Sequence, residues 1–312
     1  MTQSFTLAEA QLTQPSLVTI GVFDGVHRGH QQLITRLVSE AHAAGRLAVV
    51  VTFFPHPDVV LRGLQGRYYL TTPEQKADLL AQLGVDYVIT YPFSREASQV
   101  RAADFVDMLR DHLQMATLWV GPDFAMGYKR EGNVTFLRAQ GERQGFTVQE
   151  MSLIVNGGGK IGSSAIRQAI QAGEMETAHQ WLGRGYSVVG TVVHGEGRGH
   201  KIGFPTANLD VWEEQVLPPN GIYAGWVWLD GQRYMAATNV GLRPTFEGAT
   251  SITVEPYLLD FNRDIYGQQL ELTFEKRLRP EAKYNNLQDL IDQIGRDVAD
   301  TRAYLLAQPE NG

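Results

Sequence analysis

The chain has 312 residues, a formal net charge of −7 and no cysteine. This length is typical of about two globular domains, and the acidic balance disfavours nucleic acid and anionic membranes as partners. The lack of cysteine excludes disulfides, thiolate catalysis and cysteine zinc sites, and it is consistent with a cytoplasmic location. We expect neither a secretory signal in "MTQSFTLAEAQL" nor a membrane span, because the apolar runs are too short.

Apolar strands alternate with amphipathic helices through the first half of the chain. Helical spacing and end signals predict a helix after the capping pattern at Thr72, and other helices at 30–44, 102–113 and 134–143. Strands are predicted at 17–23, 47–54, 85–90, 118–121 and 146–151. The alternation predicts an α/β doubly wound parallel sheet, in which ligands bind beyond the carboxyl ends of the strands at a switch point.

The pattern changes near residue 183. Helical segments at 166–172 and 174–182 precede strand-like runs at 186–194, 222–229, 233–240, 251–259 and 268–274. A last amphipathic helix is expected at 287–306, with one apolar side formed by Leu290, Ile291, Ile294, Val298 and Tyr304. We therefore predict an α/β domain at 1–183 and, at 184–312, a mostly β closed barrel with a C-terminal helix.

The stretch "GVFDGVHRGH", from Gly21 to His30, turns the first predicted strand into the first helix. Such a turn points backbone N–H groups and the positive end of a helix at a bound ligand. Gly25 and Gly29 let a phosphate approach the backbone, and His27 and His30 can donate hydrogen bonds to it. A nearby polyphosphate would raise both imidazole pKa values above about 6.5, which favours the donor form. This elbow, residues 21–30, therefore predicts a site for a nucleotide triphosphate.

Other interpretations of the elbow are weaker. Its spacing is not G-x-G-x-x-G and no G-K-[ST] follows, which excludes the dinucleotide fingerprint and the P-loop. In "NGGGKIGSS", Ile161 follows the lysine, so this run is not a P-loop either. One histidine alone would most simply be a turn residue beside a helix cap, and a zinc pair has no evident third ligand.

The elbow resembles the H-x-G-H signature of the nucleotidylyltransferase superfamily. "VTFFPHP" (51–57) and "GPDFAMG" (121–127) resemble the FAD synthetase module of bacterial bifunctional riboflavin kinase/FAD synthetases. The resemblance implies that FMN attacks the α-phosphorus of ATP directly. It implies catalytic roles for His27, His30 and Arg167, and nucleotide contacts from Gly21, Phe23, Asp24, Gly29, Ser163 and Ser164. It implies flavin-side contacts from His56, Asp123 and Phe124, each of which alone would be an ordinary loop residue.

"IGSSAIR" (161–167) resembles the second superfamily motif, I-S-S-T-x-I-R. It differs from that motif by Gly162 in place of the first serine and by Ser164 in place of threonine. Ser163 and Ser164 can still cap a helix toward phosphate, and Arg167 can still pair with phosphate. Alone, the run is an ordinary helix N-terminus.

"VVHGEGRGHKIGFPTANLD" (192–210) contains closely spaced glycines followed by P-T-A-N. A glycine loop can fold over nucleotide phosphates, and Thr206 and Asn208 offer neutral oxygens to Mg²⁺, although glycines alone would favour a flexible hairpin loop. The run resembles the signature of riboflavin kinases, which have a small closed β-barrel. The resemblance implies that Thr206 and Asn208 bind Mg²⁺ and that the nucleotide contacts Gly195, Gly197, Arg198, Gly199 and Gly203.

"SITVEPYLLDFNRDIYG" (251–267) places Glu255 in an alternating strand, where alone it would be a solvated carboxylate. The resemblance implies that Glu255 is the base that accepts the proton of the ribityl hydroxyl. "TNVGLRPTF" (238–246) and "RLRPEAKYNNL" (277–287) also match the family. They imply that Asn239, Arg243 and Arg279 lie near the flavin or phosphates, although Arg279 could equally be a surface cation.

The resemblance spans nearly the whole chain. It implies that ATP phosphorylates riboflavin to FMN and then adenylylates FMN to FAD and pyrophosphate, with Mg²⁺ as the metal and flavoproteins as recipients of the products. One alternative is a riboflavin kinase in which the altered "IGSSAIR" motif leaves the adenylyltransferase module inactive. Another is a flavin- or nucleotide-binding regulator without turnover.

Overall fold

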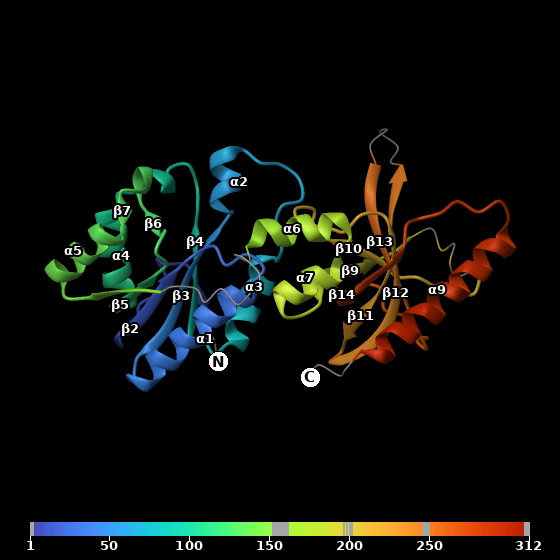
Figure 1. The fold of residues 1–312 in the computed structure, drawn as a ribbon, viewed down its shortest axis with the longest axis horizontal. Helices are drawn as coiled ribbons and strands as arrows, with labels where there is room; N and C mark the ends of the chain where they lie inside the picture. Colours follow the sequence, from blue (N-terminus) through green and yellow to red (C-terminus); the bar gives the residue numbers. More distant parts are fainter. Residues whose placement is uncertain are drawn as a thin grey trace. The chain divides into compact units, whose positions relative to one another are not determined.

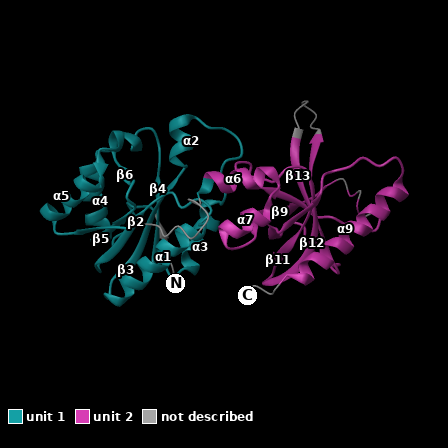
Figure 2. Cartoon of the chain, viewed as in Figure 1, with its two compact units in different colours: residues 1–163 teal, residues 164–312 magenta. Residues whose placement is uncertain are grey.

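The computed structural model describes residues 3–151, 162–195, 197, 199, 202–244 and 250–308. The chain forms two compact units, residues 1–163 and 164–312 (Figure 2). This division leaves nearly all of α6 (Ser163–Ala172) and all of α7 (Met175–Leu182) in the second unit. The expected domain boundary at about 183 assigns both helices to the first module, and that assignment stays a prediction.

A six-stranded parallel sheet forms the centre of the first unit (Figure 1). Its strands lie in the order β1-β4-β3-β2-β5-β8, and every neighbouring pair is parallel. The bounds are β1 Gln3–Phe5, β4 Tyr87–Pro92, β3 Leu47–Phe54, β2 Ser16–Ile20, β5 Met115–Val120 and β8 Thr147–Glu150. The chain runs from β2 through β3 to β4 and then crosses back to β5 and β8. The predicted doubly wound sheet is confirmed, and its switch point lies between β2 and β5.

Helices cover both faces of this sheet, because side chains alternate along each buried strand. On β3, Val49 and Val51 belong to the core that includes side chains of α4 and α5, whereas Ala48 and Val50 belong to the core that includes side chains of α1 and α3. The bounds are α1 Arg28–Ala43, α3 Pro73–Gln82, α4 Ala102–Leu113 and α5 Val134–Gln144. The predicted capping box of α3 forms between Thr72 and Gln75.

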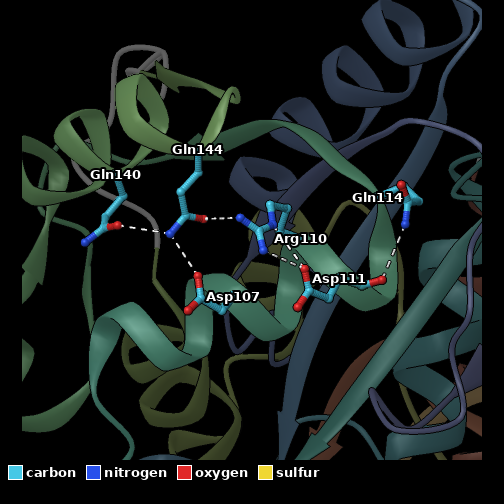
Figure 3. Close-up of polar contacts among 6 residues, drawn as sticks. All are labelled: Asp107, Arg110, Asp111, Gln114, Gln140 and Gln144. Carbon is cyan, nitrogen blue, oxygen red and sulfur yellow. Dashed lines mark hydrogen bonds and ion pairs between the residues drawn. The ribbon is translucent and has the colours of Figure 1, made fainter.

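A polar cluster ties α4 to α5 (Figure 3). Gln144 Nε2 donates to Asp107 Oδ1 at 2.8 Å and to Gln140 Oε1 at 3.1 Å, and Arg110 Nη1 donates to Gln144 Oε1 at 3.3 Å. Gln140 is buried, so its amide oxygen needs this partner. The cluster fixes the two helices that cover one face of the sheet.

Short elements that the periodicity did not predict complete the first unit. Helix α2 (Pro57–Arg62) follows β3, and the hairpin β6 (Ala125–Met126) and β7 (Gly132–Asn133) follows β5. Two single turns of 3₁₀ helix span Ala97–Gln99 and Tyr128–Arg130. Segments this short carry too few residues for a hydrophobic period to be recognised.

The second unit is an antiparallel, nearly closed barrel. Its strands lie in the order β10-β9-β14-β11-β12-β13, and β15 pairs with β11. The bounds are β9 Tyr186–Val193, β10 Asn208–Val211, β11 Gly221–Leu229, β12 Gln232–Pro244, β13 Thr250–Leu258, β14 Gln269–Phe274 and β15 Lys276–Arg279. The two outermost strands of the order meet where Ala207 N, just before β10, donates to Pro256 O of β13 at 2.9 Å. This contact supports the predicted barrel.

Helix α9 (Leu287–Ala307) packs against β11 and β12. Its buried residues are Asp297, Thr301 and Leu305, and the residues of the predicted apolar side are all partly buried. Asp297 is buried because the Arg279 guanidinium donates to its two carboxylate oxygens at 2.8 and 2.6 Å. The buried side of α9 therefore combines the predicted apolar residues with an ion pair, and hydrophobic spacing does not reveal the ion pair.

We predict opposite stability effects from two Gly→Ala changes in this unit. A Cβ at Gly225 on β11 would overlap the Thr273 carbonyl oxygen of β14, so Gly225→Ala should cost about 1–3 kcal/mol of unfolding free energy. No described atom lies within 4 Å of a Cβ at Gly295 in α9, so Gly295→Ala should add about 0.5–1 kcal/mol. Denaturant unfolding measures both variants, and equal stabilities would contradict the barrel packing.

Candidate functional sites

Three loops with predicted site residues follow three adjacent parallel strands of the first unit. The elbow follows β2, the loop with His56 follows β3, and the loop with Asp123 follows β5. The carboxyl ends of parallel strands lie at the same edge of a sheet, and β2 and β5 flank the switch point. The topology thus brings segments from three separate parts of the sequence to one edge.

The elbow has an unusual backbone. Phe23, Gly25 and Val26 have φ angles of 51°, 78° and 38°, in the left-handed region that phenylalanine and valine rarely adopt. The Asp24 carboxylate between them is buried and accepts hydrogen bonds from Leu70 N at 3.0 Å and Thr71 N at 3.3 Å. Strain of roughly 1–3 kcal/mol per residue persists only where surrounding contacts fix the turn, and Asp24 supplies such contacts.

The two histidines form a stacked pair at the start of α1. His27 is the N-cap, and its Nδ1 accepts a hydrogen bond from His30 N at 3.3 Å. The imidazole centroids are 3.6 Å apart with an interplanar angle of 17°. A Cβ at Gly29 would lie 3.2 Å from His27 Cε1. The H-x-G-H spacing therefore has a physical reason, because a glycine between the histidines lets the first ring lie on the helix turn.

His30 has a polar atom without a protein partner. Its Nδ1 is buried and accepts or donates no hydrogen bond among the residues that the structure describes, and the Phe23 ring packs edge-on against it at 5.1 Å between centroids. Burial, the adjacent His27 and the Lys76 ammonium lower the pKa of His30 well below its ordinary value. The raised pKa expected from the sequence applies only when a polyphosphate is bound, because its negative charge would oppose these three effects.

Lys76 is a buried cation that sequence reasoning missed. Its Nζ on α3 donates to Val22 O at 3.2 Å and to Phe53 O at 3.3 Å. Burial lowers the pKa of Lys76 to about 8, and the charge of Asp24 acts in the opposite direction. One sequence signal was available: Lys76 stands four residues before the buried Leu80, on the helix stripe expected in the core.

The other predicted residues of the first module lie in different surroundings. Ser163 Oγ donates to the Asp24 carbonyl oxygen at 2.9 Å, so it contacts the elbow directly. His56 is the buried N-cap of α2, and its Nδ1 accepts from Asp58 N at 3.0 Å. Asp123 is exposed, whereas Phe124 packs against the sheet core.

Arg167 and Ser164 belong to the second unit. The Arg167 guanidinium is buried and donates to Ser164 Oγ at 3.5 Å. Their part in the nucleotide site stays a prediction.

Four predicted residues of the second module converge. Arg243 Nη2 donates to Asn208 Oδ1 at 3.2 Å and to Glu255 Oε1 at 3.1 Å. Asn239 on β12 stands directly opposite Glu255 on β13. The neighbours of Asn239 and Glu255 in sequence, Val240 and Val254, are buried, so these two polar side chains share the face that points away from the barrel interior. Through these two hydrogen bonds, Arg243 on β12 links β10 with β13.

The glycines of the 195–203 loop explain how it approaches this cluster. A Cβ at Gly195 would overlap the Asn208 amide, and one at Gly199 would overlap the Phe204 carbonyl oxygen and lie 3.3 Å from Thr206 Oγ1. Gly197 and Gly203 have φ angles of 65° and 85°. The backbone at Gly195 therefore lies directly against Asn208, and the backbone at Gly199 lies beside Thr206. The predicted Arg198 lies outside the described residues.

For Arg279 and Glu281, near the last strand of the barrel, the structure adds to what the sequence predicted. Arg279 pairs with Asp297 of α9, as described above, and is not part of the Arg243 cluster; its flavin contact stays a prediction. Glu281, in contrast, was missed. A Cβ at Gly241 would lie 3.5 Å from Glu281 Oε1 and 3.2 Å from Asn239 Nδ2, which places this carboxylate beside the cluster. Its exposed loop position gives no periodic signal.

We predict that Gly29→Ala lowers the FMN adenylylation that the sequence resemblance implies for the elbow. The added Cβ must push the His27 ring away from the turn, because 3.2 Å is too close for a carbon–carbon contact, and a misplaced donor should cost about tenfold or more in rate. Steady-state FAD formation measures the loss. Phosphorylation of riboflavin by the same variant is the control, and unchanged FAD formation would show that the ring position is unimportant.

Comparisons with known proteins cover both units. A family model for FAD synthetase matches residues 9–165, and one for riboflavin kinase matches residues 182–305. The bifunctional riboflavin kinase/FMN adenylyltransferase of Listeria monocytogenes is 38% identical over 92% of each chain, and that of Escherichia coli K12 is 36% identical over 92% of each chain. A solved structure described as a macrolide-efflux protein from Streptococcus pneumoniae has a TM-score of 0.85 and 29% identity, and the match covers 96% of this chain and 98% of that chain.

The doubly wound sheet with its histidine elbow, followed in sequence by a barrel with a glycine loop, defines a two-module transferase that uses ATP. The comparisons make the assignment specific. The chain belongs to the family of bifunctional riboflavin kinase/FMN adenylyltransferases, and it phosphorylates riboflavin to FMN and adenylylates FMN to FAD. None of the helices in the described part of the chain has the length and apolar character of a membrane span.

Proposed function

We propose that the elbow binds the triphosphate of the ATP that adenylylates FMN. The observation that carries this proposal is the buried Nδ1 of His30, which has no hydrogen-bond partner in the described part of the chain, beside the stacked His27 at the N-terminus of α1. An imidazole nitrogen without a protein partner is costly to bury, and a phosphate oxygen would satisfy it. The amino end of a sixteen-residue helix adds a positive potential to the same place.

In this mechanism the phosphate of FMN attacks the α-phosphorus of ATP, and pyrophosphate leaves. Negative charge grows on the leaving pyrophosphate as the bond breaks, and His27 and His30 stabilise it by donating hydrogen bonds. Gly21 and Gly29 keep the backbone accessible, while Ser163, Ser164 and Arg167 hold phosphate oxygens. His56, Asp123 and Phe124 contact the flavin side, because their loops follow the strands that flank β2.

The kinase site is proposed to lie around Arg243. Thr206 and Asn208 supply neutral oxygens, the kind of ligand that Mg²⁺ prefers. The Asn208 amide oxygen accepts from Arg243, yet an amide oxygen has two lone pairs and can serve a cation as well. The oxygens of Thr206 and Asn208 therefore fit Mg²⁺, which would neutralise phosphate charge when bound. No group of three or more histidine, aspartate or glutamate side chains in the described residues could hold a metal, so substrate phosphates would supply further ligands.

Glu255 is proposed to accept the proton of the ribityl hydroxyl as that oxygen attacks the γ-phosphorus of ATP, the bond from this phosphorus to the bridging oxygen breaks, and ADP leaves. Its carboxylate is partly exposed and lies 3.1 Å from the Arg243 guanidinium. Arg243 orients the carboxylate and joins it to Asn208, so the base and the nucleotide side are held by one cation. Asn239 and Arg279 are assigned to flavin or phosphate contacts, and the glycine loop with Arg198 to the nucleotide.

We also propose residue limits for the two modules and a cellular location for the protein. Residues 1–183 are proposed to form the adenylyltransferase module and residues 184–312 the kinase module. The absence of cysteine is consistent with action in the reducing cytoplasm, where flavoproteins would receive the FMN and FAD.

Replacing both elbow histidines tests the adenylyltransferase proposal. His27→Ala/His30→Ala should lower FAD formation from FMN by at least about 10²-fold, because the leaving pyrophosphate loses its donors. FMN formation from riboflavin should stay within about twofold of the wild-type rate in the same preparation. Chromatographic separation of the flavins measures both steps, and an equal loss of both would contradict independent modules.

The matching change in the barrel is Glu255→Gln. Loss of the general base should lower riboflavin phosphorylation by about 10²- to 10⁴-fold. Supplied FMN should still be converted to FAD at the wild-type rate, which serves as the control for folding of the first module. Normal FMN production by this variant would remove Glu255 from the mechanism.

A further inference from the structure

One buried ammonium group joins two segments of the adenylyltransferase edge. Lys76 Nζ donates to Val22 O, in the elbow, and to Phe53 O, near the end of β3. Val22 O also accepts from Thr52 Oγ1 at 2.8 Å. Lys76 therefore connects the phosphate elbow with the strand that leads into the His56 loop.

Filling the space between α3 and the sheet would not by itself require a charge at this position. Lys76 is only 6% exposed, and burying an ammonium group is costly unless something repays the lost hydration. A methionine of similar length would fill the same space without that cost. The charge is therefore retained at the expense of folding free energy, which is typical of functional positions.

The charged groups that face Lys76 belong to the elbow and to α1. Asp24 is the negative one, and its charge raises the pKa of Lys76. His27 and His30 are the imidazoles, and the Lys76 charge is one of the causes, after burial and His27, that lower the pKa of His30. The Asp24 carboxylate is already held by backbone N–H groups of residues 70 and 71. An anion above the elbow would therefore meet two imidazoles with an ammonium group close behind them.

We propose that Lys76 is a positioning residue for FMN adenylylation: it fixes the elbow through the Val22 and Phe53 carbonyl groups and adds positive charge behind His30. The inference rests on the proposed binding of the ATP triphosphate at the elbow. It assigns no direct contact between Lys76 and substrate.

This role has a consequence for the pH dependence of the two activities. Lys76 carries its proton below its pKa of about 8 and loses it as the pH rises through that value. The kcat/KM for adenylylation, which reports the free enzyme, should therefore fall above about pH 8. Riboflavin phosphorylation should not share this fall, because Lys76 belongs to the first unit.

Two variants separate the charge from the shape of the side chain. Lys76→Met should lower kcat/KM for adenylylation at least tenfold at pH 7 and abolish the fall above pH 8. Lys76→Arg keeps a charge that persists to high pH, so it should retain at least a third of the activity and also lack the fall. Lys283→Met, an exposed lysine of the second unit, is the control for removing one charge and should behave like the wild type.

The outcomes are decisive in either direction. The inference is wrong if Lys76→Met keeps both the rate and the fall of kcat/KM above pH 8. It is wrong as well if the wild type shows no such fall, or if Lys76→Arg shows the same fall as the wild type. It is also wrong if the adenylylation lost in Lys76→Met only follows lost thermal stability. If Lys76→Met does not fold, the pH profiles of the wild type and Lys76→Arg decide alone. A wild type that makes no FAD, or whose FAD formation survives loss of both elbow histidines, would instead refute the proposed elbow site.

Discussion

The adenylyltransferase site depends on a left-handed turn that a buried carboxylate holds in place. Asp24 accepts hydrogen bonds from the backbone that leads into α3, while Phe23 and Val26 adopt positive φ angles on either side of it. This turn sets the direction of α1 and stacks His27 on His30. Without it, the amino end of α1 would not point its N–H groups at the switch point of the sheet, where a parallel sheet binds its ligands.

In both modules, charged side chains make hydrogen bonds that hold the segments of the proposed site in place. In the first, Lys76 donates to a carbonyl group of the elbow, and the Asp24 carboxylate within the elbow accepts from N–H groups. In the second, the Arg243 guanidinium joins Asn208 to Glu255 across the strands that nearly close the barrel. Burying Lys76 and Asp24 costs folding free energy, whereas the Arg243 pair is partly exposed. Both arrangements fix residues assigned to phosphate chemistry.

Much of the architecture could be predicted from local patterns. The extent of β3 and α4 was predicted correctly to the residue, because long apolar runs and helical spacing are strong signals. The elbow was recognised because three glycines and two histidines stand close together in the chain. The apolar side predicted for α9 is the side that is buried, but hydrophobic spacing did not indicate that Asp297 shares it, because its pair with Arg279 joins residues on different elements.

The sequence by itself determined the alternation of strands and helices, the two phosphate motifs and the family, because each of these is written in neighbouring residues. Only the tertiary structure decided that Lys76 reaches the elbow, that Arg243 bridges Asn208 and Glu255, and that Glu281 lies beside Asn239. These contacts join residues on different elements. Strand order and helix packing bring them together, and no hydrophobic period or local motif records which distant side chain a buried charge will find.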